Sequence, residues 1–321
     1  MKPLITITGD IGSGKSTIGR HLANALGYGY VSGGEIQRRL ASGQGLTTLE
    51  QNKLSMDDPA VDERIDGYLR QLDSTAQRMV VDSRLAWFFI RDAFNIYISV
   101  DPVVGARRVL STPRDEEHHD GLADAVRNNM TRKQLEDERF ACLYNANCKD
   151  IHSFNLVLDS TWVRADPLAR LAAQAFADAQ EDVFGSRALI CPRSLYPTQQ
   201  VRELAGDTTE RVLRAMEAEG FDDRTPIGAV RFGDYFFIWD GHWRTSCALR
   251  MNLDLVPCEI HLAHEESPIR GLQYGEEVRA SLGFPWLADW ESAHSFDFAS
   301  RPENDGKPNL GHVNECGDVR S

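Results

Sequence analysis

No run of apolar residues in this sequence reaches the roughly 18 to 20 positions that a membrane-spanning helix requires, although 42% of the residues are hydrophobic. We therefore expect no membrane span. Paired cysteines are also lacking: the six cysteines are scattered and form no C-x-x-C pair, which favours reduced thiols in a cytoplasmic protein. Residues 1–8 enter a strand-like pattern directly, without a charged and apolar leader, so we do not expect secretion.

The sequence also lacks an excess of positively charged residues. The chain has 35 Lys and Arg against 48 Asp and Glu, which gives a net charge of −13. Such a field repels nucleic acid and anionic membrane surfaces, so neither partner is favoured and any anion site must be local. The length of 321 residues is too great for one small kinase-sized domain and suits two domains.

Short β-rich runs alternate with longer helical ones up to about residue 184, which predicts a parallel α/β sheet covered by helices. The expected strands are Leu4–Thr8, Met79–Asp82, Asn95–Val100 and Asn155–Leu158. The pattern changes near Gly185, and shorter strands and helices follow. We therefore predict a first domain over 1–184, a smaller α+β domain over 187–290, and a polar, mobile tail over 291–321.

The strongest motif follows the first predicted strand. Gly9-Asp10-Ile11-Gly12-Ser13-Gly14-Lys15-Ser16-Thr17 fits the phosphate-loop pattern G-x-x-x-x-G-K-[ST], and a helix is predicted directly after it. Its glycines let backbone N–H groups curl around phosphate oxygens, Lys15 adds a cation, and the Ser16 hydroxyl can reach Mg²⁺. Motor proteins, GTPases and small-molecule kinases share this loop, so the loop predicts a nucleotide and leaves the reaction open.

The acceptor side is indicated by two further segments. Residues 31–41 carry a hydroxyl and arginines in a loop-to-helix turn that can face a second phosphate. Asp82 and Arg84 end another strand, at the sheet edge where ligands bind in open α/β folds. Arg84 lies in an otherwise apolar passage, where an unpaired charge is costly. Asp82 suits a helix cap, a Mg²⁺ contact or an acceptor contact.

The order of these segments resembles the cytidylate kinases, in particular their short form, from Ile5 to about Phe176. The likeness rests on the phosphate loop, Val31–Ala41, Gly45–Glu50, Asp62 and Asp66, Val80–Ala86, Thr131–Phe140 and Leu158–Thr161. The resemblance implies a P-loop kinase that transfers phosphate from ATP, with Mg²⁺, to a nucleotide acceptor. It also implies catalytic roles for Lys15, Arg84, Arg132 and Arg139, donor contacts from the phosphate loop, Arg108 and Arg114, acceptor contacts from Ser32, Arg38, Asp82, Arg84 and Asp159, and Mg²⁺ contacts from Ser16 and Asp82.

A second anion site is predicted in the later part of the chain. A strand ends at Asp240, and a helix carrying Arg244 begins after Gly241-His242-Trp243. Over about 188–264 this arrangement resembles the ParB-like and sulfiredoxin-like fold, in which a G-x-x-R turn receives nucleotide phosphates. That implies an anion site at Gly241, His242 and Arg244, and a second nucleotide there. The alternative is that Asp240 caps the helix and Arg244 pairs at the surface.

Three functions fit these observations. The first is an ATP- and Mg²⁺-dependent nucleoside monophosphate kinase acting on CMP or dCMP. The second is a P-loop kinase that phosphorylates a hydroxyl of a modified nucleoside, a nucleic-acid base or a small metabolite, with Asp82 or Asp159 as the general base. The third is a nucleotide-gated switch whose second domain contacts DNA or a protein.

Overall fold

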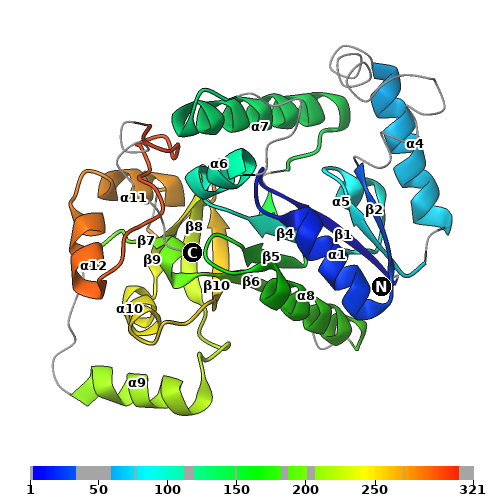
Figure 1. The fold of residues 1–321 in the computed structure, drawn as a ribbon. Coiled ribbons are helices and arrows are strands. Elements are labelled where there is room, and N and C mark those ends of the chain that lie inside the picture. The colour runs from blue at the N-terminus through cyan, green and yellow to red at the C-terminus, as the bar shows by residue number, and fades with distance from the viewer. Residues whose placement is uncertain are drawn as a thin grey trace.

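One continuous sheet of ten strands runs through the computed structural model, which describes residues 3–33, 59–75, 77–111, 119–148, 150–181, 187–200, 207–269 and 271–310 (Figure 1). The strand order within these residues is β2-β3-β1-β4-β5-β6-β10-β8-β9-β7. The strands are β1 Leu4–Gly9, β2 Gly29–Ser32, β3 Met79–Asp82, β4 Phe94–Ser99, β5 Leu156–Asp159, β6 Arg187–Ile190, β7 Leu195–Tyr196, β8 Ile227–Phe232, β9 Tyr235–Asp240 and β10 Val256–Leu262.

The helices connect and cover these strands. They are α1 Lys15–Leu26, α4 Pro59–Thr75, α5 Ala86–Phe89, α6 Pro102–Ser111, α7 Leu122–Tyr144, α8 Ala165–Gln180, α9 Asp207–Glu219, α10 His242–Arg250, α11 Tyr274–Ser281 and α12 Trp286–His294, with short 3-10 turns at Ile151–Ser153 and Pro192–Ser194. No described helix is long and apolar enough to cross a membrane.

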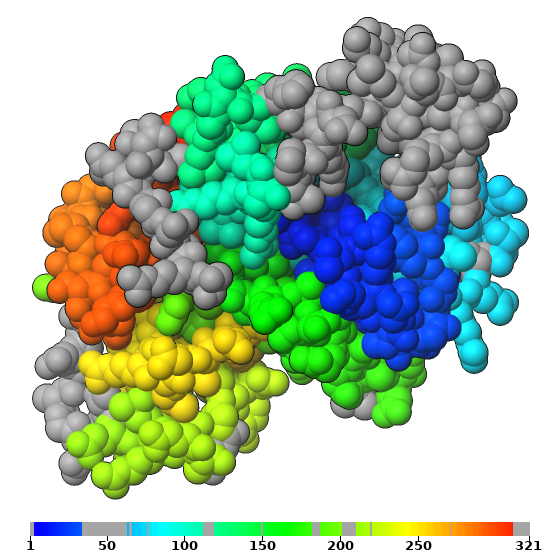
Figure 2. Space-filling model, in the orientation of Figure 1, coloured from blue at the N-terminus to red at the C-terminus, as the bar shows by residue number. Residues whose placement is uncertain are grey.

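The first half of the sheet is parallel from β2 to β6, which confirms the predicted α/β class. Strands such as β1 and β5 are buried along their whole length, as parallel strands are when helices cover them. On one side, α1 and α8 lie together (blue and green in Figure 2) and insert Ile18, Leu22 and Phe176 into this core. Parallel strands end at one edge, so Gly9, Asp82, Ser99 and Asp159 come together there.

The sheet does not stop at the predicted domain boundary. β6 pairs in parallel with β5 and antiparallel with β10, so the strands after residue 187 extend the first sheet. A shared apolar core crosses the same point, because Tyr97 and Phe154 pack in one cluster with Ile190 and Phe237. The division at 184–187 stays a prediction, and the sheet runs across it without a break.

Residues 291–310 differ from the polar, mobile tail predicted for 291–321. The last turns of α12 lie there, and Phe298 is buried in a stacked contact with Tyr196, with ring centroids 4.7 Å apart. Ser300 is also buried and bonded to Asp101. Composition suggested a tail because the segment is polar and rich in Asn, Asp, Gly and Pro, but Phe296 and Phe298 join the core and Leu310 packs against α6 and α7. Residues 311–321 lie outside the described residues.

Candidate active site

The turn between β1 and α1 has the backbone geometry that a phosphate-binding loop requires. Gly9 and Gly12 have φ values of +155° and +78°, and a Cβ atom at either position would lie 2.2 Å from a neighbouring carbonyl oxygen, that of Ile98 or Gly105. Only glycine therefore permits this close approach. Gly14, also left-handed, leads into α1 at Lys15, so the N–H groups of the first helical turn point toward the loop.

Asp82, at the end of β3, receives hydrogen bonds from two hydroxyl groups. Ser16 Oγ donates to Asp82 Oδ2 at 2.5 Å, and the Tyr30 hydroxyl donates to the same oxygen at 2.8 Å. Burial and the neighbouring Asp82 charge raise the pKa of Tyr30, which keeps its phenol a donor. Ser16 and Asp82 thus bring two hard oxygen ligands together, and this donor set fits Mg²⁺, which is bound through few carboxylates, phosphates and water.

Lys15 lies in a cluster of charged side chains. Burial lowers its pKa, and the nearby positive charges of Arg84 and Arg132 lower it further, while Asp82 and Glu136 act in the opposite direction. Glu136 joins the two arginines: its Oε2 lies 2.8 Å from Arg84 Nη1, and its Oε1 accepts a bond from Arg132 Nε at 3.0 Å. The structure therefore brings together three predicted catalytic residues, contributed by α1, the β3–α5 turn and α7.

Arg108, on α6, lies against the phosphate loop and the segment after β5. Its Nη2 donates to the carbonyl oxygens of Ser160 and Thr161 at 2.7 and 3.1 Å, and its Nη1 lies 3.4 Å from the Gly12 carbonyl oxygen. Burial lowers its pKa, whereas the Asp159 charge acts against that change. The guanidinium plane is thus fixed beside the loop predicted to hold the donor nucleotide.

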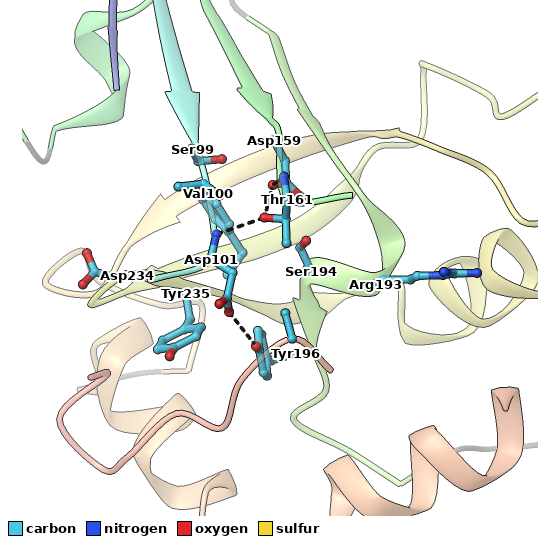
Figure 3. Close-up of a pocket in the computed structure, with 12 residues that line it drawn as sticks. Ser99, Val100, Asp101, Asp159, Thr161, Arg193, Ser194, Tyr196, Asp234 and Tyr235 are labelled. Carbon is cyan, nitrogen blue, oxygen red and sulfur yellow. Dashed lines mark hydrogen bonds between the residues drawn. The ribbon is translucent and has the colours of Figure 1, made fainter. Parts of the chain in front are cut away.

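Asp159 is predicted as an acceptor contact, but both of its carboxylate oxygens accept hydrogen bonds from the protein itself. Its Oδ1 accepts bonds from the Thr161 amide and hydroxyl at 2.9 and 2.6 Å, and its Oδ2 accepts one from the Cys191 amide at 3.2 Å. It borders a small cavity of about 20 Å³, which Figure 3 shows with Asp101 between Thr161 and Tyr196. Burial raises the pKa of both Asp101 and Asp159.

The remaining predicted residues of the first half fall into three groups. Ser32 ends β2 beside Asp82, its partner in the parallel register, and so lies at the same edge of the sheet. Arg139 lies near Tyr144, whose hydroxyl donates to Asp66 of α4 at 2.6 Å. Burial and Asp66 raise the pKa of Tyr144 to about 12, and the positive charge of Arg139 opposes that rise. Arg38 and Arg114 lie outside the described residues.

Within the loop itself, Ser13 and Thr17 support the turn through their backbone. The Ser13 amide donates to the Asp10 carbonyl at 3.2 Å, and the Thr17 amide donates to the Gly14 carbonyl at 3.0 Å. The Ile11 carbonyl oxygen packs closely against Gly105 of α6, because a Cβ atom on Gly105 would lie only 2.5 Å from that oxygen. The loop is thus held on one side by its own bonds and on the other by α6.

The predicted second anion site borders a cavity of about 290 Å³. Gly241, His242 and Arg244 line it together with the indoles of Trp239, Trp243 and Trp290. Gly241 has φ +92° and no side chain caps α10. Arg244 Nη2 donates to Asp240 Oδ2 at 2.8 Å and to the Pro226 carbonyl at 3.2 Å. The ion pair with Asp240 offsets the charge expected to attract an anion.

Sequence reasoning missed two residues of the site, Glu136 in the Lys15 cluster and Tyr30 beside Asp82. Glu136 stands four residues after Arg132 in a predicted helix, a spacing that places both on one face, so its pairing with Arg132 could have been read from the sequence. Its second partner, Arg84, comes from another element and left no local signal. Tyr30 was missed because the short strand β2, three of whose four positions are exposed or half-buried, shows no clear apolar alternation.

Known proteins resemble the first half of the chain. A family model described as an AAA domain matches residues 5–136. The cytidylate kinase of Natronomonas pharaonis is 32% identical over 174 residues, which cover 54% of this chain and 88% of that protein. The cytidylate kinase of Sulfurisphaera tokodaii is 27% identical over 168 residues, or 52% of this chain and 92% of that protein. Among solved structures, a shikimate kinase from Acinetobacter baumannii bound to shikimate gives a TM-score of 0.40 at 17% identity, covering 56% of this chain and 96% of that one.

The parallel sheet, the glycine loop and the Lys15 cluster define a P-loop kinase, which is an enzyme of the phosphotransferase class. Through the half of the chain that these relatives match, the chain belongs to the cytidylate kinase family.

Proposed function

We propose that the chain catalyses ATP- and Mg²⁺-dependent phosphoryl transfer to a nucleoside monophosphate, with CMP or dCMP as the acceptor. The observation that carries this proposal is the grouping of Lys15, Arg84 and Arg132 at the phosphate loop. Phosphoryl transfer needs charge stabilisation around the moving group and little covalent help from the protein. The acceptor class comes from the names of the relatives.

The proposed mechanism needs no side-chain base, because an acceptor phosphate is already nucleophilic. Its oxygen attacks the γ-phosphorus of ATP in line, a new P–O–P linkage forms, and the bond to the leaving ADP breaks. Mg²⁺ held near Ser16 and Asp82 would offset charge on the donor phosphates. Lys15 holds those phosphates, and Arg84, paired with Glu136 as an ion pair, presents N–H donors to the transferring group. Arg108 holds the donor nucleotide beside Gly12.

The alternative acceptor, a hydroxyl group, would require a general base. Asp82 already accepts bonds from Ser16 and Tyr30, and Asp159 from Thr161 and Cys191, so both candidate carboxylates are engaged. This supports a phosphate acceptor. A phosphorylated hydroxyl on a modified nucleoside, a nucleic-acid base or a small metabolite stays the second candidate, and product analysis separates the two.

For the second half we propose a further ligand site in the 290 Å³ cavity, within a ParB-like or sulfiredoxin-like unit spanning 187–290. A nucleotide there would place phosphate at Gly241 and the α10 N-terminus and its base among the indoles. Because Asp240 pairs with Arg244, the phosphate would have to compete with that carboxylate. A switch that contacts DNA or a protein is the third candidate function. The proposed setting is the cytoplasm, where ATP is available and thiols stay reduced.

The test is ATP consumption with mass identification of the product, over CMP, dCMP, UMP, dTMP, AMP, GMP and hydroxymethyl pyrimidine nucleotides. Lys15→Ala serves as the blank. A nucleoside diphosphate from CMP or dCMP supports the proposal, and a new phosphomonoester supports the hydroxyl alternative. Silence with every acceptor, while ATP still binds, would contradict the nucleoside monophosphate proposal and favour a specialised hydroxyl acceptor or the nucleotide-gated switch.

A further inference from the structure

The side chain of Asp10, the second residue of the phosphate loop, is anchored outside the loop. Its carboxylate is buried and accepts bonds from the Tyr97 hydroxyl at 2.7 Å, the Val100 amide at 3.2 Å and the Lys133 ammonium at 2.6 Å. Tyr97 and Val100 belong to β4 and its end. The loop is therefore tied through Asp10 to the neighbouring strand and to α7.

Lys133 also contacts the second half of the chain. Its Nζ lies 2.6 Å from Asp10 Oδ1 and 2.6 Å from Asp234 Oδ1, and its side chain is 15% exposed. Asp234 stands in the two-residue turn between β8 and β9, more than 200 positions from the loop. One ammonium thus joins the phosphate loop to a hairpin of the second half, and it follows Arg132 directly on the same helix.

Two further contacts hold the hairpin in place. Arg231 of β8 is buried, donates from Nη2 to the Tyr97 hydroxyl at 3.0 Å, and lies 4.9 Å above the Tyr97 ring. Gly233 packs so tightly on the later segment that a Cβ there would lie 2.1 Å from the Gly306 carbonyl oxygen. The position of Asp234 is therefore set by contacts of its hairpin with Tyr97 of β4 and with Gly306 near the C-terminus.

The charges in this group balance. Asp10 and Asp234 are negative, and Lys133 and Arg231 are positive. Burial acts to raise the pKa of Asp10, but the charges of Lys133 and Arg231 outweigh it and lower that pKa, so the carboxylate stays ionised. Loss of one member of such a buried group leaves an uncompensated charge, which the surroundings accommodate only by moving.

We propose that Lys133 and Asp234 are positioning residues for the phosphate loop, so that the second half of the chain sets the affinity of the kinase site for ATP. The juxtaposition of Asp10, Lys133 and Asp234 carries this inference, which rests on the proposed ATP-dependent function. Preorganised loop amides already point at the phosphates before binding, and in catalytic sites a misplacement of about 1 Å costs about 100-fold in rate. The second half is then part of the donor site.

The test measures the dissociation constant of Mg²⁺–ATP by calorimetry on the full chain, together with thermal unfolding. We expect Asp234→Asn to weaken ATP binding several-fold and Lys133→Met to weaken it about tenfold to 100-fold. Lys133→Arg, which keeps the charge, should recover part of the affinity. The matched control is Arg214→Met, which breaks an exposed pair with Glu210 on α9 and should leave the affinity unchanged.

The KM for ATP, compared with kcat, distinguishes a positioning role from a general loss of stability. Positioning raises the KM for ATP well below the unfolding temperature, whereas a merely structural role lowers only the melting temperature. Should Lys133→Met not fold, Asp234→Asn decides, because it leaves the bond between Lys133 and Asp10 in place. If folded Asp234→Asn and Lys133→Met bind ATP with unchanged affinity, the inference is overturned and the proposed function stands. Failure of the unaltered chain to bind ATP more tightly than Lys15→Ala overturns the proposed function and the inference with it.

Discussion

The two ends of the sheet use charged residues in different ways. At the edge formed by β1 and β3, Lys15, Arg84 and Arg132 form a half-exposed cluster with an excess of positive charge. At β8 and β9, Arg231 and Asp234 belong to a buried group whose charges cancel. An unbalanced cluster at an open edge suits a transient anionic ligand, whereas a balanced buried group suits permanent positioning. The comparison indicates that the charged residues of the first half suit catalysis, whereas those of the second half suit positioning of the site.

The largest effect is expected from Lys15→Ala, which removes the phosphate-loop cation. We expect phosphoryl transfer to fall about 1,000-fold or more, because charge on the donor phosphates is no longer offset, with thermal stability nearly unchanged. Steady-state assays with ATP and CMP measure this. Retained turnover would mean that the cluster at the open edge is not the catalytic site.

Arg84→Ala should reduce kcat by about 100-fold, because we propose that its guanidinium stabilises the transferring group. The control is Arg224→Ala, which removes an exposed arginine that pairs with Asp222 in its own turn. An equal loss in both variants would point to misfolding instead of a lost catalytic contact.

Glu136→Gln sharpens the comparison, since it removes the carboxylate that holds Arg84 and Arg132. We expect kcat to fall about tenfold, because a neutral amide binds guanidinium more weakly and both arginines become less well placed. Pre-steady-state measurement of the transfer step is the direct readout. A kcat above that of the unaltered chain would show that Glu136 competes with the substrate for the arginines.

The dependence of stability on pH separates two kinds of buried carboxyl group. Asp101 has a folded pKa raised above its usual value of 3.8, so it destabilises the fold as pH rises from 3.8 through that folded pKa. Asp10 has a lowered pKa, so its contribution is present above 3.8 and is lost as pH falls through the folded value. Urea unfolding measured across this pH range should show that the free energy of unfolding depends less on pH in two variants. The dependence should be flatter above pH 3.8 in Asp101→Asn and flatter below pH 3.8 in Asp10→Asn. Matching profiles in the two variants would contradict this assignment.

The smallest effect is expected at the exposed ion pairs. Arg214→Met on α9 should change the free energy of unfolding by less than about 0.5 kcal/mol, because solvent screens the pair with Glu210. Chemical denaturation measures this. A larger change would mean that α9 contributes to the fold through more than its surface.

Local patterns predicted β1, β3, β4 and β5 and the loop after β1, whereas β2 and the long-range pairing of strands were not accessible from the sequence. Leu4–Gly9 and the glycine loop are contiguous, so spacing alone indicated their arrangement. Asp234 and Asp10 lie far apart in the chain, and nothing near either residue signals the other. The edge-to-edge pairing of β5 with β6 was missed for the same reason, because a strand's pattern shows that it is buried and does not identify its neighbour.

The most direct test of the central claim follows the labelled γ-phosphoryl group of ATP when the full chain is mixed with Mg²⁺ and CMP or dCMP. The account predicts label in the β-phosphate of CDP or dCDP, and none in the Lys15→Ala reaction. Label confined to inorganic phosphate, or carried on a sugar or base hydroxyl, would contradict the claim that this site transfers phosphate to a nucleoside monophosphate.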